Sequence, residues 1–409
     1  MVPIQKITVS IDFGNEELQV GELIQQGRSI FFKYYTGFIQ SGIEISPFHL
    51  PLGDKIFEAP AQPFEGLFGV FYDSLPDGWG RLLLDRTLTA KGMLLQDVTA
   101  LQRLAYVGLK GMGALTYRPQ IETSAQEIMQ VELDAISKEM NAVLQGSSSS
   151  IIDELYEMGG SSGGARPKIL VGYNPKTDHL IHGVDSLPES YEHWLIKFPS
   201  SNDRQDIAQI EYAYHKMAVA AGISMADCRL FSSASDHKFF GTKRFDREGD
   251  GRFHLHSAAA MLNDNFRYSN MDYGNLMDAA FRLERNVSGL EKVLRIAAFN
   301  VFSHNRDDHS KNISYLMDSK GNWQLAPAYD LTYSNSSHGM HSTAIANESA
   351  NPTRRHLREL ASEFGMRNAA PIVEQVADAV SQWKFFAKDA GVSKESTELI
   401  DKRIQKQIL

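Results

Sequence analysis

The segment from Ser303 to Asn312, SHNRDDHSKN, has residue types and spacing suited to phosphoryl transfer. Within it, Arg306-Asp307 and Asn312 match R-D-x-x-x-x-N, the spacing of protein-kinase catalytic loops. One carboxylate can accept the proton of an attacking hydroxyl, and an amide oxygen about five residues later can hold a magnesium ion beside the same phosphates. The alternative is a solvated polar loop, because an Asp and an Asn at this spacing often occur by chance.

Asp330 is the candidate for a second magnesium ligand. It lies 18 residues after Asn312 and follows the short apolar stretch Leu325-Ala326-Pro327. Kinases hold their second magnesium ligand on an Asp at such a place. Magnesium prefers hard oxygen ligands, usually one or two carboxylates together with phosphate oxygens. A turn or helix-capping role for Asp330 is the alternative.

A Gly-rich segment lies upstream of these groups. Residues 159–168 read GGSSGGARPK and precede the apolar run Ile169-Leu170-Val171. Glycines let backbone N–H groups approach phosphate oxygens closely, and Lys168 adds a cation. The spacing fits neither the Walker A motif nor G-x-G-x-x-G, so a flexible linker continuing from Ser150 is the alternative.

Two further segments follow in the chain order of a kinase. Lys197 lies in the apolar run HWLIKF, where its charge needs a partner. Kinases place such a lysine against the ATP phosphates and pair it with a helix glutamate, for which Glu211 is the candidate. An edge-strand lysine that reaches water is the alternative. Lys243-Arg244-Phe245 would form an adenine-bordering hinge, although a strand end with a salt-bridged Asp246 fits equally well.

The elements that must position these groups form a mixed pattern. Alternation in the first 35 residues predicts a small antiparallel sheet. Helices are expected at about 77–90, with Asp77 as N-cap, at 97–104 and at 126–145. The run Gly146–Ser150 predicts a flexible domain boundary. Beyond it we expect strands near 168–173, 192–198 and 238–245, a helix near 207–221, and a mostly helical chain after 250.

Composition narrows the class of protein. The chain of 409 residues is longer than one core usually supports, and its 43% hydrophobic and 22% charged residues exclude a disordered chain. The net charge of -9 argues against a whole-surface nucleic-acid binder. The single cysteine, Cys228, excludes an intrachain disulfide framework. No run approaches the about 20 apolar residues of a membrane span, so we expect a cytoplasmic protein without membrane contact.

Four segments resemble those of the HipA family of serine/threonine kinases, the toxins of HipA–HipB toxin–antitoxin systems. The segment 74–83, SLPDGWGRLL, resembles the signature of the family's N-terminal domain. The segment 163–168, GGARPK, resembles its phosphate loop, and 307–312, DDHSKN, resembles its catalytic loop. The segment 326–332, APAYDLT, resembles its metal-binding turn. The combination is far more specific than any one segment.

The resemblance implies a role for each matching position. Asp307 would be the catalytic base, Asn312 and Asp330 would bind magnesium, and Lys197 would contact the ATP phosphates. Autophosphorylation of a loop serine, Ser161 or else Ser162, would expel the loop and switch the kinase off. The phosphate loop would comprise Gly163, Gly164, Ala165, Arg166, Pro167 and Lys168; Lys243, Arg244 and Phe245 would border the adenine; His309, Lys311 and Tyr329 would lie near the nucleotide.

The resemblance also implies an α+β fold, in which a small N-terminal β-rich domain precedes a two-lobed protein-kinase-like fold with a largely helical C-terminal lobe. We expect the N-terminal domain over 1–120, a helix and linker over 121–150, the N-lobe with its Gly-rich loop over 151–246 and the helical C-lobe over 247–409. The expected cofactors are ATP and magnesium.

The implied function is a protein serine/threonine kinase and toxin. Its expected partners are a HipB-like helix-turn-helix antitoxin, through which DNA would be contacted indirectly, and a protein acceptor such as a translation factor or an aminoacyl-tRNA synthetase. One alternative is a small-molecule phosphotransferase with the same catalytic set. Another is a nucleotide-binding regulatory subunit with little catalysis, against which the intact Asp307, Asn312, Asp330 and Lys197 argue.

Overall fold

The computed structural model describes residues 4–121, 129–147, 151–160, 163–182, 186–336 and 339–408. Contacts between residues divide the chain into two compact units. The first unit comprises Met1–Asp203, Phe231–His256 and Met317–Gly321. The second comprises Arg204–Leu230, Ser257–Leu316 and Asn322–Leu409.

The first unit begins with the predicted antiparallel sheet. In β1, Ile7, Val9 and Ile11 are fully buried, as the alternation of apolar residues requires. The order β4-β3-β2-β1-β5 places a strand from much later in the chain beside β1. The strands are β1 (Lys6–Asp12), β2 (Glu17–Gln26), β3 (Ser29–Tyr34), β4 (Ile56–Glu58) and β5 (Leu115–Arg118), with the short helices α1 (Thr36–Ser41) and α2 (Gly69–Tyr72) between them in sequence.

A second sheet of the first unit has the order β10-β11-β9-β7-β8-β6. Strands β7, β9 and β11 fall where the sequence predicted strands, whereas β6, β8 and β10 were not predicted. The register of β7 and β9 sets Lys168 opposite Lys197. The chain passes from the second unit into the first within β10. The strands are β6 (Met129–Gln130), β7 (Lys168–Asn174), β8 (His179–His182), β9 (Glu192–Lys197), β10 (Cys228–Ser232) and β11 (Lys238–Lys243).

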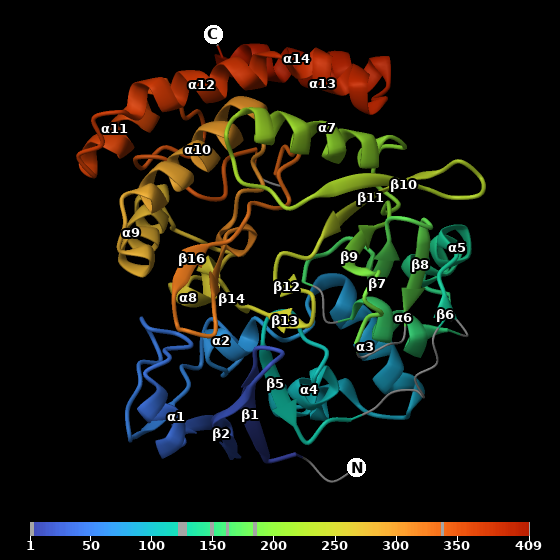
Figure 1. Cartoon of the computed structure of the whole chain (residues 1–409), viewed down its shortest axis with the longest axis vertical. Coiled ribbons are helices and arrows are strands. Elements are labelled where there is room, and N and C mark those ends of the chain that lie inside the picture. The colour runs from blue at the N-terminus through green and yellow to red at the C-terminus, as the bar shows by residue number, and fades with distance from the viewer. Residues whose placement is uncertain are drawn as a thin grey trace. The chain divides into compact units, whose positions relative to one another are not determined.

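The helices α3 (Gly78–Ala90), α5 (Leu133–Leu144) and α6 (Ile152–Gly159) share one core with this sheet (Figure 1). Trp79 and Leu83 of α3 pack in the same buried cluster as Ile169 and Ile196. Side chains from both sides of the Gly146–Ser150 run therefore join in one core, although the domain limits given above stay a prediction. Residues 148–150 lie outside the described part.

Two predicted helices of the first unit differ in extent from their observed counterparts. The helix expected over 126–145 is α5, which begins only at Leu133, because Met129–Gln130 pairs with β8 as strand β6. The helix expected at 97–104 is α4 (Ala100–Val107), whose Thr99 and Gln102 form a capping box. The helix near 77–90 is confirmed as α3.

The second unit is mainly helical, as the sequence after 250 predicts. Helix α10 packs against α9 and α12 (Figure 1). The apolar run LRIAAFNVF forms the buried half of α10. In the described ranges, none of the helices combines the length and the apolar character needed to cross a membrane. The elements are α7 (Ile207–Ala220), α8 (Ala258–Met261), α9 (Tyr273–Glu284), α10 (Ser288–Ser303), η2 (Ser310–Asn312), β15 (Ser314–Met317), β16 (Trp323–Leu325), α11 (Arg354–Glu363), α12 (Ala369–Ser381), α13 (Trp383–Ala390) and α14 (Lys394–Ile408).

A buried ion-pair cluster holds the segment after β11 to the loop before β5. The Asp246 carboxylate is fully buried and accepts hydrogen bonds from Arg244 Nη2 at 2.7 Å, Arg247 Nη1 at 2.7 Å and Gly113 N at 2.7 Å. Burial alone would raise the pKa of Asp246, but the two guanidinium groups hold it below its ordinary range. The salt-bridged Asp246 of the alternative interpretation is thus present.

We expect Asp246→Asn to lower the free energy of unfolding by about 3–5 kcal/mol, because two buried guanidinium groups lose their carboxylate. Urea denaturation of the full chain measures this. The control Asp236→Asn removes a carboxylate that is 87% exposed and pairs with Lys238. We expect the control to change stability by at most about 0.5 kcal/mol, and equal small effects of both changes would contradict the importance of the cluster.

Candidate active site

The catalytic-loop segment begins where helix α10 ends. His304 takes the left-handed backbone conformation, with φ 58°, and turns the chain out of the helix. Tyr214 Oη donates to the Ser303 carbonyl at 2.6 Å, and Asn305 N donates to the Asn300 carbonyl at 3.0 Å. The start of the loop is therefore fixed to α7 and α10, both in the second unit.

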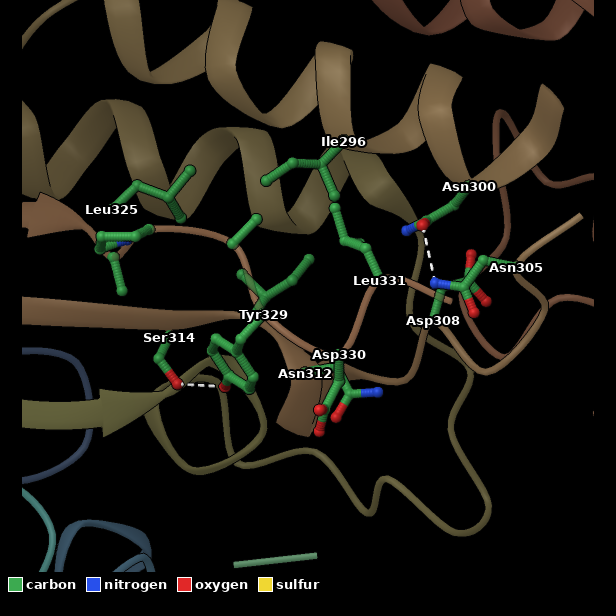
Figure 2. Close-up of a pocket in the computed structure, with 14 residues that line it drawn as sticks. Ile296, Asn300, Asn305, Asp308, Asn312, Ser314, Leu325, Tyr329, Asp330 and Leu331 are labelled. Atoms are coloured by element: carbon green, nitrogen blue, oxygen red, sulfur yellow. Dashed lines mark hydrogen bonds between the residues drawn. The ribbon is translucent and has the colours of Figure 1, made fainter. Parts of the chain in front are cut away.

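A pocket of the second unit brings the two predicted magnesium ligands together. Figure 2 shows the Asn312 amide beside the Asp330 carboxylate at this pocket, which α10, the catalytic loop and residues 325–331 line. Asn312 Nδ2 donates to the Asp307 carbonyl at 2.8 Å. This bond uses the amide nitrogen and turns the amide oxygen toward Asp330 (Figure 2).

The turn that carries Asp330 is braced by Tyr329. Asp330 has φ 53°, a left-handed conformation that Asp tolerates better than most residues. Tyr329 Oη donates to the Lys311 carbonyl at 2.7 Å and lies 2.6 Å from Ser314 Oγ. Tyr329, predicted to lie near the nucleotide, thus ties the Asp330 turn to the end of the catalytic loop.

Asp307, the predicted base, is presented to solvent. Its side chain is 56% exposed, and one of its carboxylate oxygens lies 3.8 Å from His309 Nε2. The His309 ring lies 5.5 Å from that of Phe266, and Lys311 Nζ lies 5.2 Å from the same ring. The nucleotide contacts of His309 and Lys311 stay predictions, and the structure adds Phe266 as a neighbour of both.

Asp308 is a residue of this site that no sequence motif singled out. Its side chain is fully buried and accepts a hydrogen bond from His341 Nδ1 at 2.8 Å. His341 lies in the loop segment after Asp330 and is buried against this carboxylate. His338 lies outside the described residues. The sequence signal for Asp308 is its place as a second acidic residue directly after Asp307.

The Gly-rich loop of the first unit docks on the start of α3. Gly164 N–H donates to Asp77 Oδ1, and Trp79 N–H donates to the Gly164 carbonyl at 3.1 Å. Asp77 occupies the predicted N-cap position, but its carboxylate serves the loop and makes no capping bond to its own helix. Ser161 and Ser162, the predicted autophosphorylation sites, lie outside the described residues.

Glycines make this docking possible. A Cβ atom on Gly80 would lie 2.1 Å from the Gly160 carbonyl oxygen, and one on Gly78 would lie 2.5 Å from the Gly164 carbonyl oxygen. Such distances are impossible for real Cβ atoms. The D-G-W-G part of the 74–83 segment therefore needs its glycines for backbone-to-backbone contact with the loop.

Lysine side chains gather beside the loop. Lys168 is buried, and its ammonium donates to the Gly163 carbonyl. Lys197 lies directly opposite Lys168 in the sheet, with its Nζ 5.5 Å from the centre of the Phe240 ring. Glu211 is buried on α7 of the second unit, and its pairing with Lys197 stays a prediction.

The other predicted nucleotide contacts of the first unit have protein partners. Arg166 Nη2 lies 2.9 Å from an Asp203 oxygen, and Lys243 Nζ lies 2.7 Å from Glu192 Oε1. Arg244 is buried in the Asp246 cluster. Ala165 and Pro167 complete the loop, and Phe245 is half-buried after β11. Adenine binding by residues 243–245 stays a prediction, and the Arg244 side chain already has a structural role.

Family models match the chain in two stretches. Residues 14–118 match the HipA N-terminal domain, and residues 160–383, just over half of the chain, match the HipA-like C-terminal domain. The chain belongs to the HipA family. The four quoted segments all fall within these two stretches, so the predicted family is confirmed.

Two individual proteins are similar to this HipA-family chain. The "Putative kinase Y4mE" of Sinorhizobium fredii is 28% identical over 246 residues, which cover 54% of this chain and 51% of the relative. The chain thus aligns with about half the length of that curated relative. HipA of Shewanella oneidensis, solved with HipB and operator DNA, superposes with a TM-score of 0.68 at 16% identity, covering 98% of this chain and 96% of the other. This likeness confirms the predicted fold class.

The residues present fit a magnesium ion with a nucleotide. Magnesium is usually held by one or two carboxylates plus substrate phosphates, and Asn312 with Asp330 offers two hard oxygen ligands. Across the described ranges, no group of three or more His, Cys, Asp or Glu forms a metal cage. The pair suits a metal whose coordination is completed by phosphate and water oxygens.

We expect Asp77→Ala to release the Gly-rich loop, because the Gly164 amide loses its charged acceptor. Hydrogen exchange of the full chain should show the peptide that contains Gly164 exchanging at least about tenfold faster. The control Asp54→Ala changes a carboxylate that is 71% exposed. Unchanged exchange in Asp77→Ala would show that the carboxylate does not hold the loop.

We expect His304 to make the protein less stable in acid. Burial, with the nearby Arg306, lowers the pKa of His304 to about 4. The unfolded chain takes up this proton below about pH 6.5 and the folded chain only near 4, so stability falls across that window. Urea denaturation measures the free energy of unfolding at pH 7 and at pH 4. The decrease between these two pH values should be smaller in His304→Asn than in wild type, by up to about 3 kcal/mol. The control His179→Asn, at an exposed position, should show the same pH dependence of stability as wild type. The same pH dependence in His304→Asn would contradict the role of His304.

Proposed function

We propose that this HipA-family protein is an ATP- and magnesium-dependent protein serine/threonine kinase. The observation that carries the proposal is the meeting of Asn312 and Asp330 at one pocket, with Asp307 bonded through its carbonyl to Asn312. A hydroxyl-activating carboxylate next to a pair of oxygen ligands is the arrangement that phosphoryl transfer needs. The name of the Sinorhizobium fredii relative, a kinase, agrees with it.

Each group has a separate task in the proposed reaction. Asp307 accepts the proton of the acceptor hydroxyl, and its 56% exposure leaves it open to a protein substrate. Asn312 and Asp330 hold the metal, which when bound neutralises phosphate charge. In the first unit, the backbone of 163–168 and Lys197 bind nucleotide phosphates. Positioning and electrostatic stabilisation therefore supply most of the rate enhancement.

The partners and the regulation are part of the proposal. The similar Shewanella oneidensis HipA was solved with HipB and operator DNA. We extend this to a HipB-like antitoxin that carries the DNA contact and to a toxin role in which the acceptor is a translation protein. A phosphate on Ser161 or Ser162 would repel nucleotide phosphates from the adjoining loop and so switch the kinase off.

A small-molecule phosphotransferase remains the second candidate, since only the acceptor pocket would differ. The exposure of the Asp307 carboxylate favours the protein acceptor, because kinases of small molecules enclose their substrate. Label transfer to proteins distinguishes the two candidates.

We expect the purified full chain to transfer label from γ-labelled ATP to protein when magnesium is present. Asp307→Asn should reduce the transfer rate by about 10²- to 10⁴-fold with little change in ATP affinity. Asp330→Asn should weaken magnesium-dependent ATP binding itself. Calorimetry measures the affinities, and peptide mapping finds the labelled residues of the chain and of added lysate proteins.

The matched control is Asp378→Asn, at an exposed position of α12. It should transfer label at the wild-type rate. Binding of ATP without label on any protein, by wild type, would overturn the protein-kinase proposal in favour of the small-molecule alternative. An Asp307→Asn variant as active as wild type would show that another group is the base.

A further inference from the structure

We propose that Asp308 is a positioning residue that holds the backbone of Asp307 in place for phosphoryl transfer, an inference that rests on the function proposed above. Asp308 contacts no reacting atom in this assignment. It acts through the residue before it in the chain.

The Asp308 carboxylate is fully enclosed by donors. Ser342 N donates to Oδ1 at 2.8 Å and Thr343 N at 3.4 Å, while His341 Nδ1 donates to Oδ2 at 2.8 Å and Tyr273 Oη at 3.2 Å. A buried polar group is tolerated only when it is hydrogen-bonded, and here both carboxylate oxygens accept hydrogen bonds. Four donors from two separate segments allow the side chain only one position.

The same segment that binds Asp308 also binds the residue on the other side of Asp307. Ser342 Oγ donates to the Arg306 carbonyl at 3.1 Å, and Arg306 N donates to the Ser334 carbonyl at 3.1 Å. Thr343 Oγ1 donates to the Asp308 carbonyl at 2.6 Å. Ser334, Ser342 and Thr343 therefore hold both residues that flank Asp307, while the Asp307 side chain itself is exposed.

The anchor continues into the helical core of the second unit. Asn300 Nδ2 donates to Tyr273 Oη at 2.8 Å, and Asn305 Nδ2 donates to Asn300 Oδ1 at 2.9 Å, as Figure 2 shows for the latter pair. Burial and the nearby Asp308 charge raise the pKa of Tyr273 well above its ordinary value. The Tyr273 hydroxyl therefore stays protonated and donates a hydrogen bond to Asp308. This series of hydrogen bonds connects α9 and α10 with the catalytic loop.

Positioning has a kinetic signature that distinguishes it from stabilisation. A misplaced base slows the chemical step, whereas nucleotide affinity depends on other groups. Loss of a group that orients a catalytic residue typically costs about 10–100-fold in activity. Loss of a purely structural group instead lowers the folded fraction, and each remaining folded molecule reacts at the normal rate.

The first test compares Asp308→Asn with the control Asp278→Asn, an exposed carboxylate on α9 that pairs with Arg282. In the full chain, label transfer from γ-labelled ATP is measured at saturating ATP and expressed per ATP-binding site counted by calorimetry. We expect Asp308→Asn to transfer about 10–100-fold more slowly, with ATP affinity within about threefold of wild type. The control should match wild type in both quantities.

The second test uses two changes at His341. His341→Asn can place an amide N–H close to the position of Nδ1, whereas His341→Leu offers no donor. We expect His341→Asn to retain transfer within about threefold of wild type and His341→Leu to lose at least about tenfold per site. Equal rates per site in the two variants would contradict the positioning role of the Asp308 bonds.

The outcomes separate this inference from the function on which it rests. A wild-type chain that neither binds ATP nor transfers label overturns the proposed function and this inference with it. A wild-type chain that transfers label, beside an Asp308→Asn chain that transfers equally fast per site, overturns the inference alone. If Asp308→Asn does not fold, Thr343→Val replaces it in the test, because it removes only the hydrogen bond from the Thr343 hydroxyl to the Asp308 carbonyl. We expect Thr343→Val to lower the transfer rate per site, and a wild-type rate per site would overturn the inference.

Discussion

The catalytic loop depends on one buried carboxylate. Asp308 has lost its contact with water, so its charge must be balanced by donors that the fold supplies. Those donors come from α9 and from the segment after the Asp330 turn. Satisfying Asp308 therefore brings the loop of Asp307, the helical core and the chain beyond Asp330 into one arrangement, and the Asn312–Asp330 pair forms within it.

The first unit meets a different constraint, which is steric. The backbone of the Gly-rich loop and that of the α3 start approach so closely that side chains at Gly78 and Gly80 are impossible. The Asp77 carboxylate accepts a hydrogen bond from the Gly164 amide. Backbone amides of this kind are also the donors that bind phosphate oxygens. The family's N-terminal signature is thus physically part of the loop's environment, and both share a core with the sheet that carries Lys168 and Lys197.

These two constraints act on different parts of the proposed kinase. Buried hydrogen bonds fix the residues on either side of Asp307, the proposed base, and the Asp307 side chain itself stays exposed. Glycine-dependent backbone contacts fix the loop assigned to phosphate binding. Lys168 and Lys197 add positive charge locally to a chain whose net charge is -9, which suits the proposed binding of an anionic nucleotide.

The sequence by itself determined the local features. Alternation and helical periodicity predicted β1, α3, β7, β9 and α7, because these patterns follow from which face of an element is buried. Spacing within one loop predicted Asp307 and Asn312, since both belong to a single short segment. Tertiary structure alone decided that Asp77 binds Gly164 and that His341 binds Asp308. Those partners are far apart in the chain, and their meeting depends on how separate elements pack, which no periodicity or spacing encodes.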